Sequence, residues 1–109
     1  MKPAILRPQA LRDQQGEVRA TNRKEGAAPA AVRVVKATNA ALDQIERDPG
    51  IGSPVLEKRL GIAGLRTWQV AKFLLLWCYF ERGDHLDVVR LLGERQDIVA
   101  ILGAEFTAS

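Results

Sequence analysis

Two side chains in this sequence could carry acid–base or nucleophilic chemistry near neutral pH, the single histidine, His85, and the single cysteine, Cys78. His85 directly follows the Gly-Asp of a predicted hairpin turn, where an exposed turn histidine is the more common role. Cys78 lies in the apolar run FLLLWCYF, and an apolar setting raises a thiol pKa and blunts its reactivity. One His and one Cys cannot build a zinc site, and no carboxylates have the spacing of a calcium loop. The sequence therefore predicts no catalytic residue, no metal and no cofactor.

A charged junction near the C-terminus, RLLGERQDIVAIL at 90–102, is the next candidate site. Strict alternation places Arg90 in the middle of an otherwise apolar row on one face of a predicted strand. The apolar members of that row are Leu86, Val88 and Leu92. An isolated buried charge is costly, so Arg90 must be paired or must reach the rim of the sheet. The favoured interpretation is a structural clamp between Arg90 and Asp97 or Glu94, and contact with a phosphate is the alternative.

Composition limits the class of protein. A chain of 109 residues, 47% of them hydrophobic and 27% charged, is typical of one globular domain spanning residues 1–109. The net charge of +3 comes from scattered Lys and Arg, which fits an acidic protein partner at least as well as nucleic acid. The longest apolar run, at 73–80, is far shorter than the roughly 20 residues that cross a bilayer as a helix. We expect a cytoplasmic protein without a membrane segment.

The hydropathy pattern predicts an α+β fold with the order β-α-α-β-β-β-α, in which an N-terminal strand and an antiparallel helical hairpin pack on a small, twisted, mostly antiparallel sheet. The expected elements are a strand at 3–7, a helix at 9–24, a turn at 25–29, a second helix ending before Pro49, a loop at 48–54, strands at 64–70, 73–80 and 85–92, and a short helix at 94–102. Gly103 is expected to end that helix, and residues 104–109 are expected to form a flexible tail.

Several apolar and aromatic residues are candidates for docking a partner. Leu11 and Val18 form only a thin apolar stripe on the first helix, which must therefore be held by tertiary packing or by a partner. Trp68, Phe73 and Trp77 read mostly as core, and any of them at the surface would suit docking of a partner helix or strand.

Three motifs together resemble the ParE/RelE superfamily of bacterial type II toxins, and the resemblance spans Ala4 to Leu102. The motifs are the loop DPGIGSP at 48–54, Gly64-Leu65-Arg66, and the ending RLLGERQDIVAIL, which is similar to the family's RVLHGARDI. The chain departs from the family pattern at Gly93 and Gln96, which replace a histidine and an arginine of that ending. Leu76 and Phe80 also stand where ribonuclease members tend to be basic.

These departures favour the ParE branch, whose members poison DNA gyrase by protein–protein contact without enzymatic activity. The resemblance implies a cognate ParD-like antitoxin with an acidic, amphipathic C-terminal segment, a hetero-oligomer with it, and no specific DNA binding by this chain. The candidate target contacts are Arg66, Lys72, Arg90 and Arg95. The candidate antitoxin contacts are Leu11, Val18, Trp68, Phe73 and Trp77. Two alternatives stay open, a ribosome-dependent mRNA endoribonuclease and a detoxified homologue that binds only antitoxin.

Overall fold

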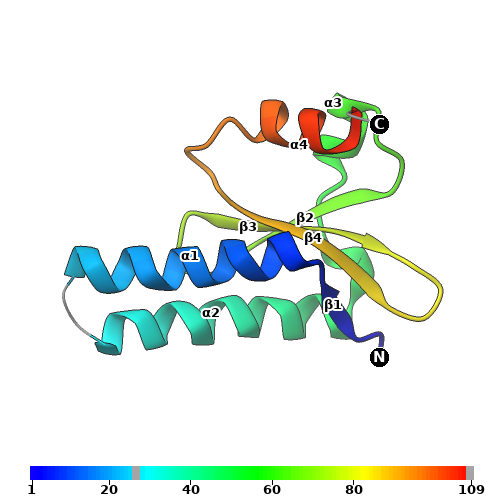
Figure 1. The fold of residues 1–109 in the computed structure, drawn as a ribbon. Helices are drawn as coiled ribbons and strands as arrows, with labels where there is room; N and C mark the ends of the chain where they lie inside the picture. Colours follow the sequence, from blue (N-terminus) through cyan, green and yellow to red (C-terminus); the bar gives the residue numbers. More distant parts are fainter. Residues whose placement is uncertain (26–27, 108–109) are drawn as a thin grey trace.

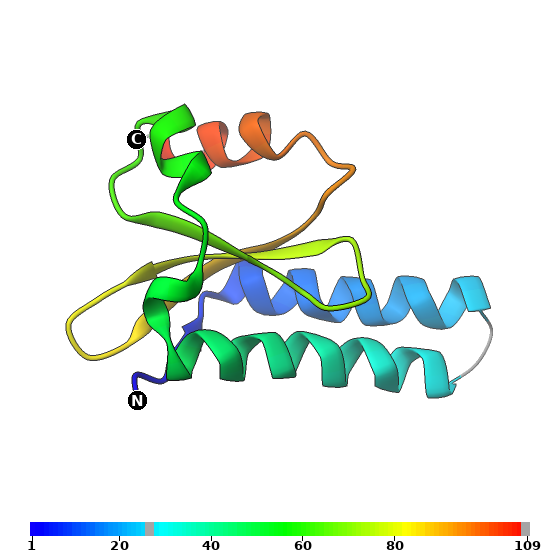
Figure 2. The same ribbon diagram turned by 180° about the vertical axis from the view of Figure 1, so that it is seen from behind.

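The structure, a computed structural model, describes residues 1–25 and 28–107. Its elements are β1 (Ala4–Leu6), α1 (Pro8–Glu25), α2 (Ala28–Arg47), the 3-10 helix η1 (Pro49–Ile51), α3 (Val55–Leu60), β2 (Leu65–Gln69), β3 (Leu75–Glu81), β4 (Leu86–Gly93) and α4 (Ile98–Thr107). The sheet has the order β1-β4-β3-β2, with β1 parallel to β4 and the other pairs antiparallel. The hairpin of α1 and α2 covers one face, while α3 and α4 lie on the other (Figures 1 and 2). The predicted fold class is confirmed.

The helical hairpin packs on the sheet through a buried stripe along one side of α2. Val34, Ala41 and Ile45 are each at most 1% exposed, and their spacing places them on one side of α2. Thr38 lies within this stripe and is fully buried, with its hydroxyl donating to the Val34 carbonyl at 2.8 Å. The Trp77 indole donates to the Thr38 carbonyl at 3.0 Å. The central strand β3 is thereby fixed to α2.

A β-bulge in β4 divides the hydrophobic core differently from the predicted alternation. Cys78 pairs with Arg90 and Tyr79 with Val88, so Val89 is the extra residue. The expected single row of Leu86, Val88, Arg90 and Leu92 is therefore wrong. Leu86 and Val88 join the cluster under the helical hairpin, whereas Leu92 and Val89 join the cluster under α4. The extra residue shifts the side-chain alternation by one position, which no hydropathy pattern reveals.

The structure also differs from the prediction at α3, at the turn between α1 and α2, and at the start of β3. α3 was not expected, because six residues are too few to show a helical period. Residues 28 and 29 already belong to α2, and residue 25 to α1, so only 26–27 of the expected turn lie between the helices, outside the described residues. β3 begins at Leu75, since Phe73 and Leu74 lie in the turn after β2.

The predicted range of the C-terminal helix, 94–102, is wrong at both ends, since residues 94–97 form a turn and the helix begins at Ile98. It runs to Thr107, so Gly103 does not end it and residues 104–107 are not a tail; residues 108–109 lie outside the described residues. Phe106 explains the extension, because its ring packs edge-on against Phe80 with the centroids 5.5 Å apart. An aromatic contact with the sheet stabilises the last turn of the helix.

An ion-pair cluster ties β1 to the β3–β4 hairpin. The Arg7 guanidinium donates to both carboxylate oxygens of Asp87, at 3.0 and 2.9 Å, and Arg82 donates to the same carboxylate at 3.0 Å. The hydrogen bonds from Arg7, with those from Arg82, hold the pKa of Asp87 below its ordinary value.

We expect Gly103→Ala to raise the free energy of unfolding by up to about 1 kcal/mol, because glycine inside a helix is less favourable than alanine by roughly that amount. A Cβ at Gly103 would meet no heavy atom within 4 Å. Urea denaturation measures the change, and Gly16→Ala, equally open in α1, is the matched control. A loss of stability would instead support a helix that ends at Gly103.

The lowered pKa of Asp87 predicts an acid-sensitive contribution to stability. The ionised carboxylate stabilises the fold at pH values above about 3.9, the ordinary pKa of Asp, and this contribution is lost as pH falls through the lower folded-state pKa. Urea denaturation from pH 7 downwards should therefore show wild type losing more stability than Asp87→Asn in this acidic range. Parallel stability profiles for the two proteins would contradict the prediction.

Candidate protein-binding surface

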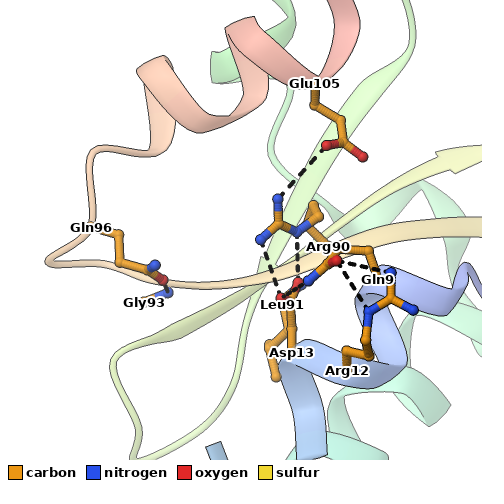
Figure 3. A network of polar contacts seen from close by, with 8 residues as sticks. All are labelled: Gln9, Arg12, Asp13, Arg90, Leu91, Gly93, Gln96 and Glu105. Atoms are coloured by element: carbon orange, nitrogen blue, oxygen red, sulfur yellow. Dashed lines mark hydrogen bonds and ion pairs between the residues drawn. The ribbon is translucent and has the colours of Figure 1, made fainter. Parts of the chain in front are cut away.

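Arg90 is the centre of a polar network that connects α1, β4 and α4 (Figure 3). Its Nε donates to Asp13 Oδ2 at 2.7 Å, and its Nη2 donates to Asp13 Oδ1 at 3.2 Å. Its Nη1 lies 3.8 Å from a carboxylate oxygen of Glu105. The Arg90 and Asp13 side chains are only 16% and 11% exposed, and their hydrogen bonds raise the pKa of Arg90 above its ordinary value. Arg90 thus forms a structural clamp.

The partners predicted for this clamp are wrong. Asp97 accepts a hydrogen bond from the Ala100 backbone N–H at 3.1 Å and so caps the start of α4. Glu94 accepts one from the Gln69 side chain at 3.1 Å. Sequence proximity suggested both residues, whereas Asp13 is 77 positions away from Arg90 and only the fold brings the two together.

Asp13 also caps an open edge of the sheet. β1 pairs with β4 only over Leu86–Val88, so the rest of that β4 edge has no neighbouring strand. The Leu91 backbone N–H donates to Asp13 Oδ2 at 3.0 Å, and the Gly93 N–H donates to the Gln96 side chain at 2.6 Å. Side chains thereby satisfy donors that an edge strand would leave unpaired.

Arg66 and Tyr79 together hold the loop at 48–54. The Tyr79 hydroxyl donates to the Pro49 carbonyl at 2.7 Å and accepts from the Gly52 N–H at 3.1 Å. Arg66 Nη1 donates to the Gly52 carbonyl at 2.8 Å. A Cβ at Gly52 would overlap the Tyr79 hydroxyl and come within 2.9 Å of ring carbons, so glycine is required there. Burial raises the pKa of the Tyr79 phenol. Arg66 is thus placed to support the loop.

Cys78 and His85, the two side chains considered for acid–base or nucleophilic chemistry, do not take part in holding this loop. Cys78 is fully buried, and burial raises its pKa to about 12. His85 Nδ1 is 2.7 Å from Asp84 Oδ1, and this hydrogen bond holds the pKa of Asp84 below its ordinary value.

Among residues 1–25 and 28–107, no group of three His, Cys, Asp or Glu side chains is placed to hold a metal. Within the same ranges, no helix has the length and apolar character needed to cross a membrane.

Lys72 and Arg95 share a groove of about 430 Å³ between α1, the β2–β3 turn and the segment after β4. Lys24 and Glu17, from α1, also line it. Burial raises the pKa of Glu17. Neither α1 residue was predicted, because the sequence does not show that this side of α1 faces the β2–β3 turn. Arg66 and Arg90 do not line this groove, so the four candidate target contacts do not form one surface.

The five candidate antitoxin contacts do not form one surface either. Leu11 is 46% exposed, and Val18 lines a shallow depression formed only by α1 and α2. Trp68 is half-buried, with its indole donating to the Gln44 side chain at 2.9 Å. Phe73 is half-buried and lines the groove of Lys72 and Arg95. Trp77 is fully buried, so none of its surface is available to a partner in this structure.

The comparisons with known proteins identify a fold. The sequence matches no protein-family model and no curated protein. The structure is similar to a solved chain described as the chromosomal ParDE TA system from P. aeruginosa, with a TM-score of 0.71 and 15% sequence identity. The match covers 85% of this chain and 96% of that chain. At this identity the similarity shows that the two chains share a fold.

Removing Asp13 should be among the most destabilising single changes in the chain. Asp13→Ala removes the hydrogen-bond partner of the Arg90 guanidinium and of the Leu91 N–H. We expect the free energy of unfolding to fall by about 2–4 kcal/mol. Urea denaturation measures the loss, and a double-mutant cycle with Arg90→Met isolates the coupling between the two side chains. Arg12→Ala, which removes only hydrogen bonds to Gln9, is the control and should change stability by less than about 0.5 kcal/mol. A similar effect of Asp13→Ala and Arg12→Ala would refute the clamp.

Proposed function

We propose that the chain is the toxin of a type II toxin–antitoxin system, that it inhibits growth by binding and poisoning DNA gyrase, and that a cognate antitoxin neutralises it. The observation that carries the proposal is the fold similarity to a chain of the ParDE system, which extends over 85% of this protein and 96% of that one. A match over nearly the whole of both chains is more informative than a shared motif, although fold alone does not define a function.

Most side chains that could take part in catalysis are hydrogen-bonded within the fold or buried, which supports action by contact rather than by catalysis. RNA cleavage needs a general base together with groups that stabilise charge on the phosphate. Tyr79 is bound to the loop backbone, and Arg90 is bound to Asp13. Cys78 is buried, and His85 lies in the turn between β3 and β4. None of these four side chains lines the groove of Lys72 and Arg95.

Lys72 and Arg95 are the target contacts that the geometry favours. Both line one groove, and both belong to turns at the end of the sheet rather than to the packed core. We assign Arg66 and Arg90 to structural support instead, since each is hydrogen-bonded within the fold. The antitoxin, which we expect to be ParD-like with an acidic C-terminal segment, would form a hetero-oligomer through exposed or half-buried apolar residues such as Leu11, Val18 and Phe73.

Tightly controlled expression of the chain, with growth, SOS induction and gyrase-linked DNA breaks measured in the same cells, tests this proposal. Wild type should arrest growth with DNA breaks. Lys72→Glu/Arg95→Glu should weaken the effect by about tenfold or more, equivalent to losing roughly 1.4 kcal/mol of binding free energy. Lys58→Glu/Arg59→Glu is the matched control, because it reverses the same charge on exposed residues of α3.

Each contrary outcome has a definite meaning. Growth arrest without DNA breaks would contradict gyrase poisoning and favour cleavage of ribosome-bound messages. Normal growth with wild-type protein present would favour a homologue that only binds antitoxin. Equal loss of toxicity in both charge-reversed variants would show that total charge, rather than the groove, determines the effect.

A further inference from the structure

A second groove, of about 410 Å³, lies between α3 and the segment 94–99, on the face of the sheet opposite the helical hairpin. In both ribbon views α3 and α4 lie side by side on this face (Figures 1 and 2). Val55 and Leu56 line the groove from α3, Ile98 and Val99 line it from α4, and Leu76 lines it from β3. No residue lines both this α3–α4 groove and the groove already described. It is therefore a separate surface.

The α3–α4 groove combines a hollow with a projecting apolar side chain. Val55, on its rim, is 62% exposed, and among the described residues only Met1 is a more exposed large hydrophobic side chain. The other apolar side chains of the groove are half-buried. Exposed apolar surface with a polar rim is typical of sites where proteins contact one another.

The two walls of the groove carry opposite charges. Arg59 lies on the α3 wall, and Glu94 and Asp97 lie on the other wall. The Arg59 guanidinium has no hydrogen-bond or ion-pair partner among the described residues. Glu94 accepts a hydrogen bond only from a neutral amide side chain, and Asp97 only from a backbone N–H. Within the part of the chain that the structure describes, neither wall has its charge neutralised.

A patch with one basic and one acidic wall is complementary to a second copy of itself. In a two-fold symmetric contact, residue i of one copy meets residue j of the other, and j meets i. An axis through the groove places Arg59 of each copy against the acidic wall of the other, and it places each Val55 beside the other groove. A uniformly acidic segment or a phosphate chain would instead be repelled by Glu94 and Asp97.

We propose that the α3–α4 groove is the contact surface of a homodimer, in which Arg59 of each copy pairs with Glu94 of the other and Val55 supplies the apolar contact. The inference goes beyond the proposed function and does not depend on it. α3 has six residues, and the segment 94–99 adds as many. Stable interfaces use roughly 20–30 residues a side, so we expect a weak dimer with a dissociation constant on the order of 100 μM.

Sedimentation equilibrium of the purified full chain tests the inference at concentrations below and above that dissociation constant. The mass should rise with concentration from the 12.0 kDa of one chain towards twice that value. Added salt should weaken the dimer, because the paired charges lie near the surface and are screened.

Charge reversals show whether this surface makes the contact. Arg59→Glu and Glu94→Arg each place like charges against each other twice in a symmetric dimer, and each should raise the dissociation constant by about tenfold or more. An equimolar mixture of the two variants should dimerise again, because every acidic side chain of one then faces a basic side chain of the other. Such recovery also shows that both variants are folded.

Lys58→Glu is the matched control, because it reverses one exposed charge of α3 outside the groove. Its dissociation constant should stay within about twofold of the wild-type value. Asp97 is left unchanged in every variant, since it caps α4.

Three results would overturn the inference: a monomer at every concentration, equal dissociation constants in Arg59→Glu and Lys58→Glu, or a variant mixture that stays monomeric. The test uses neither gyrase nor growth inhibition, so its failure leaves the toxin proposal standing. The toxicity control Lys58→Glu/Arg59→Glu should be monomeric in sedimentation and still toxic, because toxicity is assigned to the groove of Lys72 and Arg95.

Discussion

The pairing of Asp13 with Arg90 is the interaction on which the arrangement of the three layers depends. Asp13 comes from α1, Arg90 from the bulged strand β4, and the other side of the guanidinium lies 3.8 Å from Glu105 on α4. Because both paired charges are largely buried, each needs the other to offset the loss of hydration. Asp13 also accepts from the Leu91 N–H at 3.0 Å, so one carboxylate fixes both a side chain and a strand edge.

This fixed frame determines which residues remain at the surface. Arg66 and Tyr79 are bound to the loop at 48–54, and Arg90 is bound to α1, so residues that look functional in the sequence act within the fold. Lys72 and Arg95 instead lie in turns beside the helical hairpin and line a common groove. The surface that results suits recognition of another protein by charge and apolar contact, which is the kind of action proposed for the chain.

Features with a strong local signal could be predicted from the sequence. The helical spacing of Val34, Thr38 and Ile45 predicts α2, and the continuous apolar run of β3 predicts a central strand, because burial imposes those patterns directly. The Gly103 boundary was misplaced because the contact of Phe106 with Phe80, which extends the helix, is tertiary.

The site was less predictable than the fold. The position of Arg90 among apolar residues of a strand correctly predicts a clamp, but its partner is 77 residues away. The bulge that changes the side-chain alternation has no hydropathy signature. Lys24 and Lys36 join Lys72 only because the helical hairpin packs beside the β2–β3 turn. Such groupings depend on tertiary packing, so the sequence identified individual cations without the surface that they share.

The most direct test of the central claim, inhibition of gyrase by contact, uses purified components. The purified chain is incubated with DNA gyrase, ATP and a supercoiled plasmid, and gyrase-linked linear DNA is measured alongside cleavage of ribosome-bound mRNA. The account predicts that cleaved plasmid accumulates only when both the chain and gyrase are present, with the mRNA intact. Intact plasmid together with mRNA cut at defined codons would contradict it.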